Sequence, residues 1–549
     1  MNGGELVMEC LLAQGGRIGF GVPGESYLAV LDAMHDRDFR FVNARHEGGA
    51  AFMAEAWAKL TGEVGICFVT RGPGATNAAI GVHSAMQSST PMILFVGQVG
   101  TDMKGREAFQ ELDYRAVFGT MAKWAVEIED ADRIPEIIAR AYSVATRGRP
   151  GPVVIALPED ILSAVTDAKP APAIAHVEPA PAAEDIAAIT SMLEKAKRPI
   201  LLAGGSGWSE TSKRDLKALA ERLDLPVVVS FRRQDLMDNT SPCYAGDAGV
   251  GMTAATAKLM READVILTIN ARFGEMTTDG YTLLRVPSPE QTLIHAHASD
   301  GELGKIYAAN LSIHAGPNRM IAALNGMNLS DSAERSAWRA QAREGVEAIR
   351  NTRNQPSPVD MVGVCAHLRE VLPSDAILTN GAGNFAVWPS RHIPVGGQRN
   401  LLAPQSGAMG YGVPAAIAAS IEAPERRVIC FAGDGDFQMT GMELATAAQE
   451  GATPIFLVLD NGTYGTIRMH QERTFPRRVS GTDLQNPDFA ALAQSCGLFG
   501  RRVSRTEDFA DAFADACASG TAALLHLDIA TEALTPGQTI TEMRAAAEK

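Results

Sequence analysis

Two apolar runs in the C-terminal third of the chain each end in a cluster of glycine and polar residues. The run 427–432 leads into Gly-Asp-Gly-Asp-Phe at 433–437, and the run 454–459 leads into Asp-Asn-Gly-Thr-Tyr-Gly at 460–465. A segment with helical character, 441–448, separates them. This order predicts two parallel strands joined by a crossover helix. Both clusters then lie at the same edge of one sheet, where α/β proteins place their ligand sites.

Asp434 and Asn461, one from each cluster, stand 27 positions apart in the sequence. Carboxylate and amide oxygens are hard ligands that suit Mg²⁺, and backbone amides at glycine positions suit a diphosphate. Either cluster by itself is also explained as a tight turn. The pair, with a strand before each cluster and a helix between them, instead favours a Mg²⁺ and diphosphate site.

Short apolar runs alternate with helical patterns along the rest of the chain as well. This alternation predicts an α/β fold with three doubly wound parallel-sheet domains, each with its sites at the carboxyl ends of the strands. The other expected buried strands are residues 65–69, 91–96, 152–157, 199–202, 226–229 and 264–268.

Two changes in composition divide the chain. A Pro/Ala-rich stretch, 167–181, is typical of a semi-rigid linker. A charged, helix-prone region, 334–354, ends in a second group of prolines. We therefore expect three units, at residues 1–166, 184–325 and 356–535.

The bulk properties restrict the partners. The net charge of −15 argues against a nucleic acid as the default partner. No uninterrupted apolar stretch reaches the roughly 18 residues of a membrane helix, and the first residues lack the features of a signal peptide. Seven scattered cysteines without a CxxC pair indicate buried free thiols. We expect a cytoplasmic protein without a membrane or nucleic-acid partner.

The stretch 433–471 resembles the cofactor motif of acetolactate synthases, which are thiamine-diphosphate enzymes. The resemblance implies thiamine diphosphate and Mg²⁺ as cofactors, with Asp434 and Asn461 as metal ligands and Thr463 contributing its backbone carbonyl. The cofactor contacts that it implies in this stretch are Gly433, Gly435, Asp436, Phe437, Tyr464, Gly465 and Thr466.

The resemblance covers nearly the whole chain and implies a role for each unit. In order, these are a pyrimidine-binding unit at 1–166, a central Rossmann-like unit at 184–325 and a diphosphate- and Mg²⁺-binding unit at 356–535. In this family the cofactor lies between the first unit of one subunit and the third unit of another. The chain is therefore expected to form a homodimer or homotetramer.

Glu47 stands in the segment 43–51, directly before a helical pattern. An acidic residue here is explained by the helix dipole alone. The segment also resembles the catalytic Arg-His-Glu run of the family, which makes Glu47 the glutamate that hydrogen-bonds to the pyrimidine ring of the cofactor. Its neighbours by resemblance are Pro23, Gly24, Thr76 and Asn77, and Phe109 and Gln110 are expected to line the substrate pocket. An ordinary amphipathic turn is the alternative for the last two.

Met409 lies between small residues, where a methionine is usually core filler. In the family, an apolar residue at this place holds the cofactor in a bent shape, and Met409 is our candidate for it. Ser406 and Gly407 precede it in the same turn. Gly383, Asn384 and Phe385 are expected to present backbone amides to the diphosphate.

Several positions depart from the family pattern. Asp436 and Arg71 stand where relatives often have Ser, so we expect only the backbone of Asp436 to face the diphosphate. Glu159 and Met276 replace a Lys and an Arg that favour a second 2-oxo acid. His470 takes the place of a Trp, and Thr466 the place of a Met. His470 is a candidate for proton transfer, with a structural histidine as the alternative.

Residues 271–277 resemble the segment of the family that contacts FAD, and a glycine turn at 204–207 suits a nucleotide. The acidic stretch that relatives carry after a later strand is replaced by 293–298, which contains two histidines. The sequence leaves FAD binding open.

The resemblance implies decarboxylation of a 2-oxo acid, followed by carboligation of the resulting enamine to a carbonyl acceptor. The replaced cations favour the alternative of a 2-oxo acid decarboxylase or C–C lyase without a 2-oxo acid acceptor. A nucleotide-dependent oxidoreductase built on the middle unit is a remote third hypothesis. A non-catalytic relative is disfavoured because Glu47 is retained.

Overall fold

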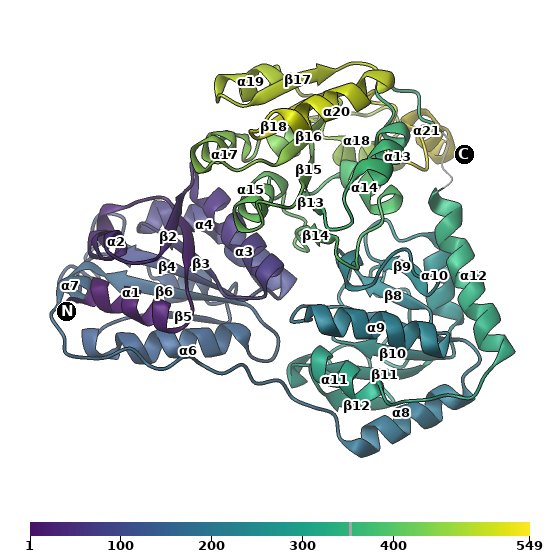
Figure 1. Ribbon diagram of the computed structural model, residues 1–549, viewed down its shortest axis with the longest axis horizontal. Coiled ribbons are helices and arrows are strands. Elements are labelled where there is room, and N and C mark those ends of the chain that lie inside the picture. The colour runs from purple at the N-terminus through teal and green to yellow at the C-terminus, as the bar shows by residue number, and fades with distance from the viewer. Residues whose placement is uncertain (351–353, 549) are drawn as a thin grey trace.

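The computed structural model describes residues 1–350 and 354–548. They form three lobes, each built on a sheet of six parallel strands with helices on both faces (Figure 1). The predicted α/β fold with three doubly wound parallel sheets is confirmed. Within the described residues, no helix is long and apolar enough to span a bilayer.

The first sheet has the strand order β2-β1-β3-β4-β6-β5. Its strands are β1 Ile18–Gly21, β2 Arg40–Asn43, β3 Gly65–Val69, β4 Met92–Gln98, β5 Trp124–Glu127 and β6 Pro152–Pro158. Its helices are α1 Gly3–Ala13, α2 Leu28–His35, α3 Glu47–Thr61, α4 Gly72–Ser88, α5 Tyr114–Phe118, α6 Ile134–Thr146 and α7 Glu159–Ser163. Strands β3, β4 and β6 are buried along their whole length, which explains their continuous apolar sequences.

The second sheet has the order β12-β11-β10-β7-β8-β9, which places three strands on each side of the point where the order reverses. Its strands are β7 Pro199–Ala203, β8 Val227–Ser230, β9 Tyr244–Ala248, β10 Val265–Ile269, β11 Thr292–His297 and β12 Leu311–His314. Its helices are α8 Ala183–Lys195, α9 Glu210–Leu223, α10 Ala254–Glu262, α11 Pro317–Leu324 and α12 Ala333–Arg350.

The third sheet, β14-β13-β15-β16-β18-β17, repeats the strand order of the first. Its strands are β13 Ile377–Asn380, β14 Asn400–Leu402, β15 Val428–Gly433, β16 Ile455–Asp460, β17 Phe499–Val503 and β18 Ala523–Asp528. Its helices are α13 Met361–Val371, α14 Val387–His392, α15 Gly412–Glu422, α16 Asp434–Phe437, α17 Leu444–Glu450, α18 Gly465–Thr474, α19 Phe489–Ser495, α20 Phe509–Ala518 and α21 Ile540–Ala547. The two predicted strands of the opening pattern are β15 and β16, which pair in parallel.

The Pro/Ala-rich stretch has no regular structure and runs along the lower side of Figure 1, from the first lobe to the second. The charged region 334–354 forms most of α12, and its residues 351–353 lie outside the described part of the chain. The limits 1–166, 184–325 and 356–535 stay a prediction.

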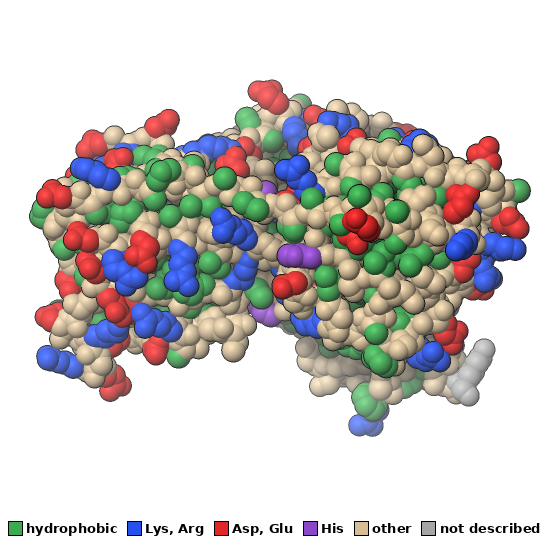
Figure 2. All heavy atoms as spheres, turned by 90° about the horizontal axis from the view of Figure 1, so that it is seen from below, with side chains coloured by type: hydrophobic (Ala, Val, Ile, Leu, Met, Phe, Trp, Pro, Cys, Tyr) green, Lys and Arg blue, Asp and Glu red, His purple; other side chains and the backbone are tan. Residues whose placement is uncertain are grey.

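The first and third lobes share one hydrophobic core, which is centred on α3 and α15. The ring of Phe52 on α3 meets that of Tyr411 edge to face, with centroids 5.4 Å apart. The Tyr411 hydroxyl donates a 2.5 Å hydrogen bond to the buried Glu55, which also pairs with Lys59 at 2.9 Å. These buried contacts fix the two lobes of one chain against each other. On the outer face shown in Figure 2, acidic and basic side chains are interspersed.

Candidate active site

A cavity of about 260 Å³ lies at the carboxyl edge of the third sheet. The ends of β15 and β16, the start of α18 and the turn after β13 form its walls. Fourteen of the predicted site residues line it: Gly383, Asn384, Phe385, Gly407, Met409, Gly433, Asp434, Gly435, Asp436, Asn461, Thr463, Tyr464, Gly465 and Thr466. The two clusters that open the sequence argument therefore do meet at one sheet edge.

Asp434 begins α16 directly after β15 and is almost fully buried. Its carboxylate accepts hydrogen bonds from the Gly435 backbone N–H at 2.9 Å and from Asn486 Nδ2 at 2.8 Å. Burial raises the pKa of Asp434 to about 6, and the neighbouring Asp460 carboxylate adds to the rise. A buried carboxylate without a full charge partner is suited to a cation.

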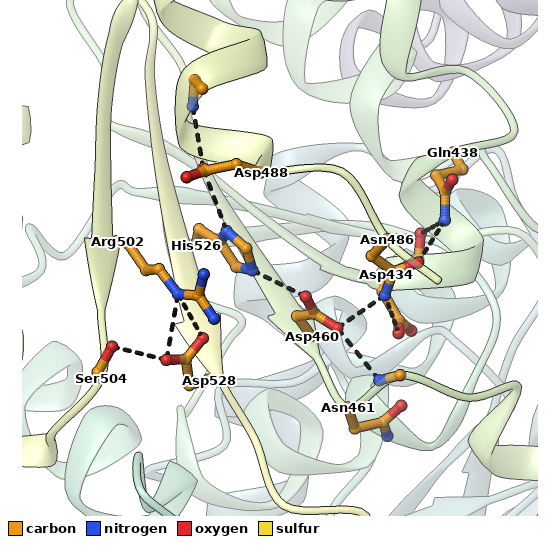
Figure 3. A network of polar contacts seen from close by, with 12 residues as sticks. Asp434, Gln438, Asp460, Asn461, Asn486, Asp488, Arg502, Ser504, His526 and Asp528 are labelled. Carbon is orange, nitrogen blue, oxygen red and sulfur yellow. Dashed lines mark hydrogen bonds and ion pairs between the residues drawn. The ribbon is translucent and has the colours of Figure 1, made fainter. Parts of the chain in front are cut away.

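A network of polar side chains lies behind Asp434 (Figure 3). Asn486 Nδ2 donates to Asp434 and, at 2.7 Å, to Asp460. His526 Nε2 lies 2.8 Å from the other oxygen of Asp460. Burial would raise the pKa of Asp460, but the hydrogen bonds with His526 and Asn486 hold it below its ordinary value. The network fixes the end of β16 and with it the position of Asn461.

The Asn461 side chain accepts a hydrogen bond from the Thr463 backbone N–H at 3.1 Å, and its backbone carbonyl accepts one from Thr531 at 3.0 Å. The Thr463 hydroxyl donates to the Thr482 carbonyl at 2.9 Å, which holds this side chain inside the protein. The described residues contain no group of three or more His, Cys, Asp and Glu that could hold a metal. A metal here would depend on one carboxylate, one amide and backbone carbonyls, the donor types that Mg²⁺ accepts.

Two glycines let aromatic rings pack directly against the cavity backbone. A Cβ atom on Gly433 would lie 2.7 Å from the Phe385 ring, and one on Gly435 would lie 2.5 Å from the Tyr464 ring. Any larger residue would displace these walls. The glycine positions thus keep the backbone amides next to the cavity, as a diphosphate site requires.

The carboxylate of Asp436 is held by backbone groups of two loops. One oxygen accepts 2.9 Å hydrogen bonds from the backbone N–H groups of Ala382 and Gly410. Burial raises the pKa of Asp436 to about 7. The carboxyl group therefore joins the loops that contain Ala382 and Gly410.

Three predicted residues of the third lobe do not line the cavity. Phe437 points into the core, where its ring meets Phe489 at 5.3 Å. Ser406 faces the first lobe, with its hydroxyl 2.9 Å from that of Ser84. His470 lies one turn beyond Thr466 on α18 and is exposed to solvent. In a single chain, nothing places His470 beside the reacting atoms.

The candidates of the first lobe gather at the carboxyl edge of their own sheet. Glu47 is the first residue of α3, and its carboxylate accepts a 2.9 Å hydrogen bond from Asn77 Nδ2. The Phe109 side chain is 73% exposed. Gln110 adopts a left-handed conformation (φ 64°), and its carbonyl accepts from the Gly72 backbone N–H at 3.0 Å. The other three candidates here are Pro23, Gly24 and Thr76, of which Pro23 and Thr76 are exposed.

None of these first-lobe residues lines the cavity of the third sheet. Glu443, which joins the two lobes next to the site, was not among the predicted site residues. Its buried carboxylate accepts hydrogen bonds from the backbone N–H groups of Arg45 and His46, at 3.1 and 3.0 Å. Its only signal was its position inside the stretch that resembles the family motif. The role of Asn486 could not be predicted from the sequence, because no motif surrounds this residue.

Two of the departures from the family pattern form an ion pair with each other. The Arg71 guanidinium contacts the Glu159 carboxylate and also pairs with Glu25 at 3.2 Å. Arg71 is buried, and its Nε has no partner within the described residues. Arg71 follows the carboxyl end of β3 and Glu159 that of β6, so the two charges meet at the same edge of the parallel sheet.

Comparison with known proteins agrees with this arrangement. Residues 1–117 match the N-terminal TPP binding domain of thiamine pyrophosphate enzymes, residues 186–324 their central domain and residues 381–527 their C-terminal TPP binding domain. The chain belongs to the family of thiamine pyrophosphate (thiamine diphosphate) enzymes, and within it the chain is similar to acetolactate synthases.

Three relatives illustrate the similarity. The acetolactate synthase isozyme 2 large subunit of Escherichia coli is 30% identical, covering 96% of both chains. The probable acetolactate synthase large subunit of Methanocaldococcus jannaschii is 31% identical, over 96% of this chain and 92% of the relative. The acetolactate synthase large subunit of Corynebacterium glutamicum is 31% identical, over 92% and 83%.

Proposed function

We propose that this enzyme decarboxylates a 2-oxo acid and joins the remaining fragment to a carbonyl acceptor, with thiamine diphosphate and Mg²⁺ as cofactors. The observation that carries the proposal is the cavity in which Asp434 and Asn461 lie together between Gly433 and Gly435. A donor set of oxygens beside open backbone amides fits a metal-bound diphosphate.

Each half of the site has a separate task. Asp434, Asn461 and the Thr463 carbonyl would hold Mg²⁺, and the turn at Gly383 and Asn384 would bind the diphosphate. Met409 would press on the cofactor from the side. When bound, thiamine diphosphate supplies the nucleophilic carbon and the electron sink.

Glu47 would hold a proton at a pyrimidine ring nitrogen of the cofactor. Asn77 orients its carboxylate through the 2.9 Å hydrogen bond, and α3 presents it at the helix start. Glu443 fixes the preceding backbone through Arg45 and His46. Glu47 is therefore positioned by both lobes of its own chain.

We further propose that the site is completed by a second copy of the chain in a homodimer or homotetramer. The first-lobe candidates do not line the cavity of their own chain. Large apolar side chains are exposed on the lobes that carry the two half sites, among them Phe109, Met442 and Ile467. Burial of such side chains against a partner is favourable. The cytoplasmic location stays a prediction.

A 2-oxo acid decarboxylase or C–C lyase without a 2-oxo acid acceptor is the second candidate. Its support is Glu159, which neutralises Arg71 where relatives carry a free cation, together with Met276 in place of an arginine. Fewer free guanidinium or ammonium groups weaken the binding of a second carboxylate.

The test is to incubate the enzyme with thiamine diphosphate, Mg²⁺ and a panel of 2-oxo acids. Both CO₂ and coupled products are measured. A coupled product supports the carboligase, whereas CO₂ with an aldehyde alone supports the decarboxylase. Turnover with a nicotinamide cofactor in the absence of thiamine diphosphate would reverse the proposal in favour of an oxidoreductase.

Glu47→Gln tests the role of Glu47 in the same assay. The amide keeps the size of the side chain but cannot hold the proton, so we expect turnover to fall by at least about 100-fold. Mg²⁺-dependent cofactor binding should persist, because the third lobe supplies it. Unchanged turnover in this variant would overturn the proposed role of Glu47.

FAD is a separate question at the second lobe. A cavity of about 280 Å³ there is lined by Gly205, Arg272 and Met276, among others, which belong to the two segments that resemble nucleotide contacts. The absorbance spectrum of the purified protein decides whether a flavin is bound. A flavin would be a structural ligand under this proposal, since no redox step is involved.

A further inference from the structure

A second cavity, of about 250 Å³, lies between the second and third lobes. Its walls come from the segments after β8 and β9 on one side and from α14 and the turn after β13 on the other. Ala382, Gly383, Asn384, Gly407 and Thr466 line both this cavity and the diphosphate cavity. The two cavities therefore adjoin across one turn of the chain.

Most of the wall of this second cavity is apolar. Phe231, Tyr244, Ile393 and Phe431 contribute large side chains to it. A ligand that reaches from the diphosphate cavity into this space would bury an apolar section of its length, which is favourable. The charged groups in the wall determine which chemical group can lie at the far end of such a ligand.

Arg232 is the arginine of this wall that makes no hydrogen bond and no ion pair with any residue in 1–350 or 354–548. Its guanidinium carbon lies 5.2 Å from the centre of the Phe231 ring, which leaves its N–H groups available to a ligand. Burial lowers the pKa of Arg232 to about 10. A half-buried cation without an ion-pair partner is costly, and a bound anion would remove the cost.

The other two arginines in the wall already donate hydrogen bonds within the protein. Arg350 donates to the Asn239 carbonyl at 3.1 Å, and Arg391 donates to the Gly251 carbonyl at 3.4 Å. Arg232 also has a left-handed backbone (φ 60°), which is unfavourable for a residue with a long side chain. Strain of this kind is retained where a side chain must be aimed at a particular point.

Asp247 is the acidic group that lines the cavity. Burial raises the pKa of Asp247 to about 6, although Arg391 and Arg232 oppose the rise. With Asp247 fully ionised, the described wall carries three guanidinium groups against one carboxylate. The surplus of positive charge favours an anion.

We propose that this cavity binds the distal carboxylate of a dicarboxylic 2-oxo acid, with Arg232 as the binding group. The inference rests on the proposed function, because the 2-oxo end must lie next to the reacting carbon of the cofactor that the adjoining cavity would hold. A guanidinium binds a carboxylate through two parallel hydrogen bonds, which selects for a planar anion. The apolar wall takes the methylene groups between the two ends.

The test compares 2-oxohexanedioate with 2-oxohexanoate, which has the same chain length and no second carboxylate. The enzyme loaded with thiamine diphosphate and Mg²⁺ should show the lower KM for the diacid. Arg232→Met should raise the KM for the diacid by about 30-fold and change that for the monoacid by less than about 3-fold. Arg232→Lys should fall between them, because the charge remains and the paired hydrogen bonds do not.

Arg261→Met is the control, since Arg261 is an exposed arginine of the second lobe that does not line the cavity. Its KM values should equal those of the unchanged enzyme. Thermal unfolding of each variant checks that the fold is retained. An equal effect of Arg232→Met on both acids would overturn the inference while leaving the proposed function intact.

Calorimetric titration with hexanedioate, which has no 2-oxo group, separates the two proposals. Binding to the unchanged enzyme that is lost in Arg232→Met supports the anion site even if no 2-oxo acid releases CO₂. Equal binding to both proteins, or binding to neither, counts against it. An inorganic phosphate titration then shows whether the site selects a carboxylate, and tighter binding of phosphate would contradict the assignment.

Discussion

The first and third lobes have the same order of six parallel strands but prepare their sheet edges differently. In the third lobe the carboxyl edge holds a cavity, and the network from Asn486 to His526 fixes its polar groups from behind. In the first lobe the predicted site residues do not line that cavity, and Phe109 is exposed to solvent. Under the proposed function, one chain contains a finished half site in the third lobe and an unfinished one in the first, which a second chain would complete.

The difference follows from the residues that end the strands. The strands β15 and β16 end in glycines and short polar residues, so backbone and carboxylate groups form the site by themselves. The strand β2 is followed by α3, which presents the long side chain of Glu47. Under the proposed function, the backbone groups of the third lobe would bind the diphosphate, whereas Glu47 would act on a cofactor that is held elsewhere. The two lobes share one fold but would contribute different chemical groups to the site.

Of the substitutions that test this difference between the lobes, Asp434→Asn should have the largest effect on cofactor binding. The amide keeps the hydrogen-bonding shape but removes the charge that a metal requires, so we expect cofactor affinity in the presence of Mg²⁺ to fall by more than about 100-fold. Trp388 lines the cavity and provides a fluorescence signal for the titration.

Asp488→Asn is the matched control. Asp488 lies 3.6 Å from His526 and caps α19 through the Ala491 N–H, a role that asparagine also fills. Its cofactor affinity should change by less than about 3-fold. If Asp434→Asn bound the cofactor as the unchanged enzyme does, the third lobe would not be the finished half site.

A smaller effect is expected where α18 is fixed to the C-terminal helix α21. The buried Glu472 carboxylate accepts from Arg544 Nε at 2.9 Å and Nη2 at 2.6 Å, and from the Arg477 backbone N–H at 2.9 Å. These bonds, with Arg544 first, lower the pKa of Glu472 from 4.5 to about 2. Glu472→Gln should reduce the free energy of unfolding by about 2 kcal/mol at neutral pH.

The pH dependence of this loss follows from the direction of the shift. A carboxyl whose folded pKa is depressed stabilises the fold above its unfolded pKa, and the contribution is lost as pH falls towards the folded value. The gap between the two proteins, measured by urea unfolding, should therefore be constant above pH 4.5 and should narrow towards pH 2. A gap that widened on acidification would contradict the assignment of this ion pair.

Much of the fold could be predicted from the sequence, because buried parallel strands are continuous apolar runs. All eight expected strands are present, and β15 and β16 pair as the opening pattern predicts. The meeting of the two glycine clusters at one cavity could also be predicted, since both clusters directly follow those strands. Residues in helices were harder to place: Phe437 belongs to the core and His470 to the surface.

Contacts between distant segments could not be predicted. Asn486 reaches Asp434 from 52 residues further along the chain. The pairing of Arg71 with Glu159 joins the ends of β3 and β6, which lie on either side of β4 only after folding. Arg232 is unremarkable as a residue beside Arg233, and only the cavity around it distinguishes the two. These contacts depend on tertiary packing, which a local sequence pattern does not show.

The most direct test of the two half sites is subunit complementation. Glu47→Gln chains and Asp434→Asn chains are each expected to be inactive as homo-oligomers. In a hetero-oligomer, Glu47 from one chain and Asp434 from the other restore one intact site of each pair. Co-expressed at equal levels and mixed at random, the two variants should recover about a quarter of the unchanged activity. Activity no higher than in either variant alone would contradict a site completed by a second copy of the chain.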